Sequence, residues 1–308
     1  RSTATLVLAR VLISTDRSQE AERLLDEALA DEDPERRSAL LVARGAALAR
    51  RHALAESERD SRAAIALARA TGCLRLLAKA RYNLATVALW AGKFELAERE
   101  AETGITEIEG ADIGDPGALA LTLGRVLEAR GFWSKAAERY GQAVATMRGS
   151  GPRVRLAQGL TIAADLDRRR GNHDAAVVGY REAVVLWRTL GDRMGLATVL
   201  KGYGQSLFAL GDNSAAERSL RESVNEYLAS GEPLGGAPAM VPLARVLLAD
   251  GRVEEALPFA RRAVDRLQAL RADASGLAAD ETLSVEAAKQ LYEEITEKLA
   301  RTGKPSEL

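Results

Sequence analysis

Five glycines divide this chain into repeats of almost constant length. Gly92, Gly131, Gly171, Gly211 and Gly251 are 39, 40, 40 and 40 residues apart, and an alanine follows each of them five residues later. A fixed period of this length is the signature of a repeated supersecondary unit whose copies stack and share one continuous core. The spacing therefore constrains the fold more than the length of 308 residues, which alone would suggest two or three domains.

Each repeat reads as two helices joined at the glycine. After Gly171, the apolar residues Ala176, Tyr180, Ala183 and Trp187 fall at the spacing of one helical face, and another apolar pattern ends just before the glycine. Glycine suits this boundary because the residue just beyond a helix end often adopts the left-handed conformation. The repeated unit is therefore predicted to be a helical hairpin.

Polar residues near the expected helix starts predict the N-caps. Ser134, Asp174 and Ser214 each precede the second helix of a hairpin, and Ser284 precedes the last helix of the chain. Ser214 and Glu217 also have the spacing of a capping box, in which a hydroxyl and a carboxylate each accept a hydrogen bond from a free backbone N–H.

The same register extends to both ends of the chain. Asp16 and His52 take the glycine position in two degenerate hairpins within residues 1–74, and five regular hairpins fill residues 75–271. A last helix over residues 281–301 has one polar and one apolar face, as the end of a stacked array requires. The predicted fold is all-α: a right-handed α-α superhelix of about seven hairpins with a C-terminal capping helix, in one continuous solenoid domain.

The start of the chain lacks such a polar face. Residues 6–13 read LVLARVLI, which is apolar almost all round a helix, and an end helix of this kind would leave apolar surface bare. We expect more protein before Arg1, so that this chain is the C-terminal part of a longer one. The alternative is a frayed or dimerised first helix.

The pattern of small and aromatic residues resembles the tetratricopeptide repeat (TPR). That motif has a small residue in its first helix, a glycine near the turn, and an alanine, an aromatic residue and another alanine in its second helix. In one hairpin these roles are filled by Gly124, Gly131, Ala136, Tyr140 and Ala143. The resemblance implies a helical-repeat fold and a surface that binds partners.

The repeat length points to a narrower resemblance. A period of 40 departs from the common TPR length of about 34 residues. Longer repeats with links such as Leu190-Gly191-Asp192 resemble the C-terminal TPR arrays of bacterial signal-transduction ATPase transcriptional regulators, of the antibiotic-pathway activator and maltose-activator-like kinds. In those proteins a nucleotide-binding switch domain precedes the repeats.

The resemblance implies that the first helix of each hairpin lines a concave groove. Residues four and then three apart share a helix face, and the charged residues among them indicate a wet face rather than a packed one. The candidate partner-binding residues on this face are Tyr82, Thr86, Trp90, Arg125, Glu128, Asp165, Arg168, Lys201, Gln205, Phe208 and Arg245. In the alternative interpretation Arg125 and Asp165 pair across neighbouring hairpins, and the other residues are ordinary solvated surface.

Patterns for catalysis and metal binding are missing from the sequence. His52 and His173 are about three repeats apart, and Cys73 has no histidine in local register. Gly202-Tyr203-Gly204 lacks the third glycine of a dinucleotide fingerprint and favours close helix packing instead. We therefore expect no enzyme, no cofactor and no metal site.

Composition narrows the function further. A net charge of −1 offers no basic stripe for nucleic acid, no apolar run could span a membrane, and a single cysteine fits the reducing cytoplasm. The leading hypothesis is a sensor or scaffold domain of a larger bacterial transcriptional or signalling regulator. Its groove would bind a protein, a peptide or an upstream nucleotide-binding domain of the same chain. The alternatives are a stand-alone TPR adaptor and a domain that binds a small-molecule effector.

Overall fold

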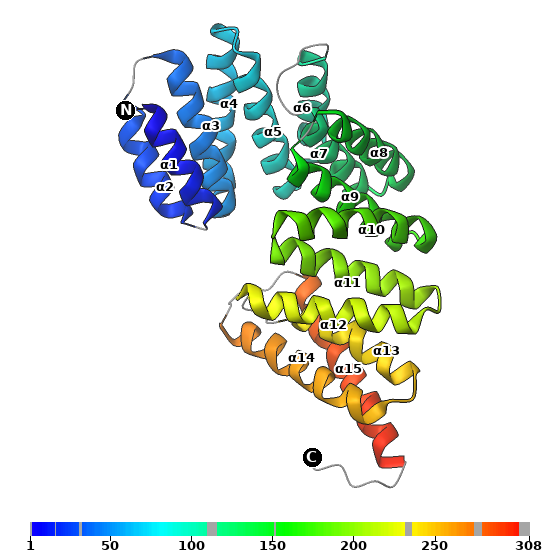
Figure 1. Ribbon diagram of the computed structural model, residues 1–308. Coiled ribbons are helices and arrows are strands. Elements are labelled where there is room, and N and C mark those ends of the chain that lie inside the picture. The colour runs from blue at the N-terminus through cyan, green and yellow to red at the C-terminus, as the bar shows by residue number, and fades with distance from the viewer. Residues whose placement is uncertain are drawn as a thin grey trace. The chain divides into compact units, whose positions relative to one another are not determined.

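The computed structural model describes residues 2–15, 17–30, 33–109, 116–150, 152–231, 236–273 and 279–301. All regular secondary structure in these ranges is α-helical (Figure 1), which confirms the predicted all-α class. The described helices pair into seven successive hairpins, and one more helix follows the seventh. In each hairpin we call the odd-numbered helix the first helix and the even-numbered helix the second.

The chain forms two compact units, Arg1–Gly151 and Pro152–Leu308, which are described separately. The first unit contains α1 (Ser2–Ser14), α2 (Ser18–Ala28), α3 (Pro34–Arg50), α4 (Leu54–Ala70), α5 (Leu74–Trp90), α6 (Phe94–Glu107), α7 (Pro116–Ala129) and α8 (Trp133–Ser150). The second unit contains α9 (Arg153–Arg169), α10 (His173–Leu190), α11 (Arg193–Ala209), α12 (Asn213–Ser230), α13 (Ala237–Ala249), α14 (Val253–Asp273) and α15 (Ala279–Arg301). The division into degenerate and regular hairpins stays a prediction.

From the second hairpin to the seventh, the turn is built on one residue with a positive φ angle. The five regularly spaced glycines have φ angles from 69° to 85°, and His52 takes the same conformation with a φ of 58°. The next residue donates its backbone N–H to the carbonyl five residues earlier, as Lys93 does to Ala88 and Asp212 does to Leu207. These bonds belong to the Schellman pattern, which ends the first helix and turns the chain back. Asp16, the turn residue expected in the first hairpin, lies outside the described residues.

The residue five positions after each turn is a buried contact point of its hairpin. Six of these positions hold fully buried alanines: Ala21, Ala97, Ala136, Ala176, Ala216 and Ala256. Ser57 takes the place in the second hairpin, where it is also fully buried, and its hydroxyl donates to the Gly45 carbonyl at 2.7 Å. Small side chains here allow the helices to approach closely, and the hydrogen bond makes a serine acceptable in the core.

Within each unit, the first helices lie on the inner side of the curve. In the first unit α3 contacts both α1 and α5, and α5 contacts α7. In the second unit α11 contacts both α9 and α13, and α13 contacts α15. No comparable contact joins the second helices of the described hairpins. A row of helices that touch along one side and spread apart along the other curves toward the touching side, so the first helices form the concave side of each unit.

Close packing between helices depends on glycines that face tyrosines. A Cβ atom on Gly124 would lie 2.4 Å from the ring of Tyr140, and one on Gly202 would lie 2.5 Å from the phenol oxygen of Tyr180. Both distances are far shorter than any normal carbon contact, so neither site has room for a side chain. The expectation that Gly202 serves close helix packing is confirmed.

The predicted capping box at the start of α12 is wrong. The helix begins at Asn213, and it is the Asp212 carboxylate that accepts a hydrogen bond from the Ala215 N–H, at 3.0 Å. Glu217, the other half of the expected box, forms ion pairs with Arg252 and with an arginine of its own helix. The Schellman turn ends at the glycine and the next helix starts at once, so the residue beside the glycine becomes the N-cap.

The other predicted N-caps also lie inside helices. α8 begins at Trp133, one residue before Ser134, and α10 begins at His173, one residue before Asp174. α15 begins at Ala279, so Ser284 lies within its first two turns rather than ahead of it. The cause is the same in the hairpins: the second helix starts closer to the turn than the polar pattern suggests.

Candidate partner-binding surface

Five of the eleven candidate residues lie in the first unit, on α5 and α7. Tyr82 is half-buried and packs against Ala78, Ile108 and Leu119. The Thr86 hydroxyl is buried, and no described atom is a hydrogen-bond partner for it. Both residues contribute more to the packing between helices than to an open binding surface.

The other three residues of this group differ in their exposure. Trp90 ends α5 and is 43% exposed, and its indole ring lies 6.4 Å from the His52 ring, centroid to centroid. Arg125 is exposed on α7. Glu128 is half-buried and accepts a hydrogen bond of 2.7 Å from the Tyr140 hydroxyl, on the second helix of its own hairpin. Trp90 and Arg125 are therefore the members of this group that a partner can reach most easily.

In the second unit, Asp165 and Arg168 of α9 are held by a tyrosine of the same hairpin. The fully buried Tyr180 donates its phenol hydrogen to the Asp165 carboxylate at 2.5 Å, and Arg168 Nε donates to the phenol oxygen at 3.2 Å. Arg168 Nη2 donates to Asp165 at 3.3 Å. Burial and the adjacent carboxylate raise the pKa of Tyr180, so the phenol keeps its proton. Asp165, Arg168 and Tyr180 thus act as hydrogen-bond partners for one another.

α11 presents three candidates along one face. Lys201, Gln205 and Phe208 are separated by four and three residues, and all three are half-buried. Burial lowers the pKa of Lys201, and the positive charge of Arg168 lowers it further, while the Asp165 carboxylate raises it. The Lys201 ammonium therefore lies in poorly hydrated surroundings beside an ion pair that is already formed.

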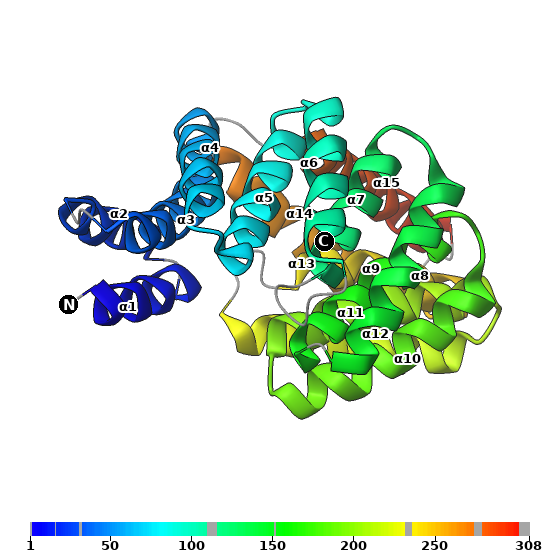
Figure 2. The same cartoon turned by 90° about the horizontal axis from the view of Figure 1, so that it is seen from above.

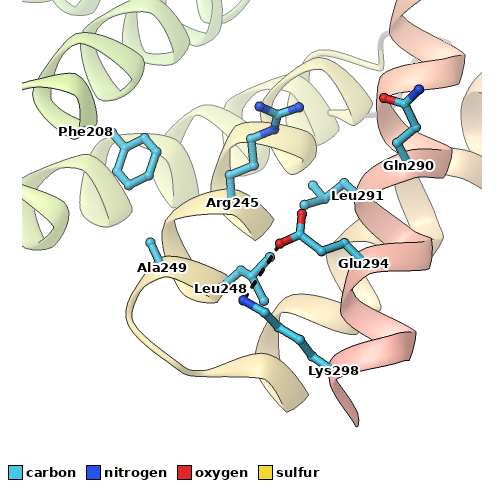
Figure 3. Close-up of a pocket in the computed structure, with 8 residues that line it drawn as sticks. All are labelled: Phe208, Arg245, Leu248, Ala249, Gln290, Leu291, Glu294 and Lys298. Carbon is cyan, nitrogen blue, oxygen red and sulfur yellow. Dashed lines mark ion pairs between the residues drawn. The ribbon is translucent and has the colours of Figure 1, made fainter. Parts of the chain in front are cut away.

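A pocket of about 370 Å³ lies between α11, α13 and α15 (Figure 3). Figure 3 shows Arg245 rising from α13, with Phe208 on one side and Gln290 on the other, and an ion pair of 3.8 Å between Glu294 and Lys298. The lining residues are Phe208, Arg245, Leu248, Ala249, Gln290, Leu291, Glu294 and Lys298. The pocket combines an apolar wall with charged and amide groups, so it offers a ligand both apolar contacts and hydrogen-bonding partners.

On the first helices of the second unit, two cationic side chains form no ion pair with a described carboxylate. Asp165 and Glu294 each have a cationic side chain beside them. Lys201 and Arg245 form no ion pair with any carboxylate in the part of the chain that the structure describes. The first-helix face of the second unit therefore carries an excess of positive charge, and a ligand with carboxylates would complement it.

The wall that α15 contributes was not predicted from the sequence. The polar face of this helix was expected to be the wet end of the array. In the structure α15 contacts both α14 and α13, so it takes the place of a further first helix, and Gln290, Glu294 and Lys298 line the pocket. The four-residue spacing of these polar side chains, on a helix that follows a second helix, is the signal that could have identified them.

No group of three or more His, Cys, Asp or Glu residues among the described residues is arranged to hold a metal ion. The Cys73 thiol lies 3.5 Å from a Glu35 carboxylate oxygen, as the donor of a weak hydrogen bond. None of the described helices is both long enough and apolar enough to cross a membrane.

The packing of these hairpins is that of a helical-repeat protein. Stacked hairpins with buried alanines, Schellman turns and a polar first-helix face make a helical-repeat scaffold, the kind of fold that TPR proteins use for protein–protein interaction. In agreement, residues 153–227 match the family model described as Tetratricopeptide repeat. No curated protein matches the chain. The matched residues coincide with α9–α12, which carry five of the candidate residues.

Solved structures share this fold over almost the whole chain. The apo form of RapI is 10% identical, with a TM-score of 0.70, and the match covers 97% of this chain and 86% of that one. A Signal Transduction ATPase with Numerous Domains (STAND) protein with a TPR sensor, from Pyrococcus horikoshii, is 14% identical, with a TM-score of 0.68. That match covers 98% of this chain and 49% of the STAND protein. A Rap protein complexed with Competence and Sporulation Factor is 15% identical, with a TM-score of 0.58 and coverage of 97% and 98%.

Proposed function

We propose that residues 152–308 bind an acidic linear segment of a partner protein across the first helices α11 and α13 and the final helix α15. The observation that carries this proposal is a pair of cations without an ion-pair partner among the described residues: Arg245 lines the pocket, and Lys201 lies about two helical turns before Phe208 on α11. A half-buried ammonium has lost part of its hydration, and a carboxylate from a ligand replaces that hydration with a charge-assisted hydrogen bond. Arg245 is able to hold a second carboxylate with two parallel bonds.

The pocket gives the ligand an apolar anchor as well. Phe208, Leu248 and Leu291 form its apolar wall, and a cavity of about 370 Å³ has room for one side chain of a peptide. Buried apolar anchors with charged neighbours are the usual source of affinity and of orientation in such complexes. The favoured ligand therefore has an apolar residue close in sequence to two or more acidic residues.

Selection from a random peptide library tests this proposal. Peptides that bind the full chain are expected to be rich in Asp and Glu around an apolar residue. Arg245→Glu and Lys201→Met are each expected to weaken the selected peptides by about tenfold or more, because each removes a partner of a ligand carboxylate. Arg181→Glu is the matched control, since Arg181 is exposed on the second helix α10. Selected peptides that are basic, or that bind Arg245→Glu as well as the unaltered chain, would overturn the proposal.

We further propose that the array is the sensor region of a larger cytoplasmic regulator. The likeness to a STAND protein with a TPR sensor supports this role, as does the smaller share of that protein which the match covers. Binding in the groove would then shift the equilibrium of an attached switch domain. Sequencing the whole reading frame that encodes residues 1–308 tests this role. A sensor requires a nucleotide-binding segment in the same frame, and a frame without such a segment favours an adaptor.

The pocket volume favours one further candidate, a small acidic effector. About 370 Å³ lies within the usual range for small-molecule sites. A thermal-shift screen of organic acids distinguishes this candidate, because a ligand at 100 times its Kd adds about 2.7 kcal/mol to the free energy of unfolding. A stabilising acid that loses its effect in Arg245→Glu would support the effector, and a screen without such a compound would leave the peptide as the ligand.

A further inference from the structure

The first helix of the chain exposes an apolar stripe. Val7, Leu8 and Val11 of α1 are 56%, 50% and 51% exposed, whereas Ala9 and Leu12 are buried in a cluster with residues of α2 and α3. The exposed residues recur at helical spacing and lie on the side of α1 away from that cluster. Figure 2 shows α1 at the outer edge of the first unit. The stripe therefore faces away from the hairpin to which α1 belongs.

The position equivalent to Val11 is buried in every later hairpin. Val11 stands five residues before its turn position, and the residues five before the next six turns are at most 1% exposed: Ala47, Val87, Val126, Leu166, Ser206 and Val246. Ala47 shares its cluster with Ala21 and Leu25 of α2, which is the second helix of the hairpin before it. Within each unit, the position of Val11 is thus where a first helix packs on the second helix of the preceding hairpin.

At four of the contacts between successive hairpins, an ion pair joins the two hairpins. A glutamate six residues after one turn pairs with a cation that stands next to the following turn. These pairs are Glu22–Arg51, Glu58–Lys93, Glu98–Arg130 and Glu217–Arg252. In each case the glutamate follows the small buried residue five positions after the turn, so Ala-Glu or Ser-Glu marks the start of the second helix.

Arg17 is the corresponding cation of the first hairpin. Its Nε and Nη2 donate to Glu20 at 2.7 and 2.6 Å, and the Nε and Nη2 of Arg252 donate to Glu255 at the same two distances. Arg252 Nη1 donates to Glu217 of the preceding hairpin at 2.7 Å. Arg17 Nη1 has no such partner among the described residues. The cation that completes the contact in other hairpins is therefore present at the edge of α1, next to the exposed stripe.

We propose that the stripe of α1 and Arg17 form a docking surface for one helical hairpin of a partner. The second helix of this hairpin begins with a small residue followed by a glutamate. The small residue and its neighbours one turn later pack on Val7, Leu8 and Val11, and the glutamate binds Arg17 Nη1. A second copy of the chain does not fit, because its glutamates at this position already form ion pairs within the copy.

An added hairpin tests the proposal on the full chain. The variant has a second copy of residues 33–76, which contains Ser57-Glu58, joined directly to Arg1. The turn residue of the copy, His52, then lies 40 positions before Asp16, which is also the distance from His52 to Gly92 in the chain. Hydrogen exchange of α1 amides is measured with and without the copy. The expected result is that exchange in α1 slows by roughly tenfold or more. An unchanged rate would overturn the proposal.

Matched variants separate docking from a general effect of the added segment. A copy with Ala64→Lys and Ala68→Lys is expected to leave the α1 rates unchanged. Arg17→Ala is expected to remove part of the slowing, and so is Glu58→Ala in the copy. The double variant is expected to lose no more of the slowing than either single variant, because both changes break the same ion pair. Equal slowing by the Lys-bearing copy would contradict the proposal. So would a dimer of the original chain, seen by sedimentation, that Val11→Asp dissociates, because a second copy would then cover α1.

Discussion

At the scale of single residues, the contact between Gly202 and Tyr180 fixes how closely α10 and α11 approach. The phenol of Tyr180 is held by Asp165 and Arg168, so it is not free to move away. A Cβ atom at position 202 would lie 2.5 Å from its oxygen. The packing of this hairpin on the next therefore depends on the absence of a side chain at one position.

Gly202→Ala is expected to lower the free energy of unfolding by about 1–3 kcal/mol, because a methyl group must displace a buried and hydrogen-bonded ring. Urea unfolding followed by circular dichroism measures the change. Gly141→Ala on α8 is the control, since nothing lies within 4 Å of the added Cβ there. The control is expected to raise stability by up to about 1 kcal/mol, because alanine favours a helix over glycine. A neutral Gly202→Ala would contradict this account of the packing.

Lys201 makes stability depend on pH in the alkaline range. Burial holds its folded-state pKa below the ordinary value. Between the folded pKa and the unfolded pKa of about 10.4, the unfolded chain binds more protons than the folded one, so the free energy of unfolding rises with pH. Below the folded pKa both states are protonated, and the cost of the buried charge is then complete.

The comparison with Lys201→Met isolates this effect. As the pH rises toward about 10, which is still below the unfolded lysine pKa of about 10.4, the unaltered chain is expected to gain stability relative to the variant in urea unfolding. Both proteins retain Tyr180, so its raised pKa affects the two curves alike and does not interfere. Parallel curves for the two proteins would show that Lys201 is as well hydrated in the folded chain as in the unfolded one.

At the scale of helices, the starts of the second helices follow the turn rather than the polar pattern. In α12, Asp212 directly after Gly211 caps the helix, and Ser214 lies inside it. Asp212→Ala is expected to lower the free energy of unfolding by about 1 kcal/mol, the usual value of an N-cap. Ser214→Ala is expected to change it by less than about 0.5 kcal/mol. Thermal and urea unfolding of the two variants give the comparison, and a larger loss for Ser214→Ala would restore the original prediction.

The helices were predictable because their signals are local. A glycine at a left-handed turn and an alanine five residues later recur with little variation, and even His52 at the glycine position takes the expected conformation. The ion pairs between hairpins were not predictable in the same way. Arg81 of α5 is buried between Glu100 and Glu107 of α6, and no short motif marks those three residues as neighbours. Such contacts depend on how helices rotate against each other, which periodicity does not specify.

At the scale of the whole molecule, the sequence predicted the class of fold better than the binding surface. The regular spacing identified a helical repeat and the sides of its helices. It did not show that Asp165 and Arg168 are occupied by Tyr180, nor that α15 closes a pocket with Phe208 and Arg245. The first contact forms between the two helices of one hairpin and the second between helices of successive hairpins, and no short sequence motif marks either of them. The binding group that we propose is therefore smaller than the eleven candidate residues and is centred on Lys201, Arg245 and the pocket.

We propose that ligands bind along the first-helix side of residues 152–308. Hydrogen exchange of the full chain, with and without the tightest acidic peptide from the library, tests it most directly. We expect slower exchange in α11, α13 and α15 and unchanged rates in the second helices α12 and α14. Slowing confined to the second helices, or unchanged rates around Arg245 and the pocket, would contradict it.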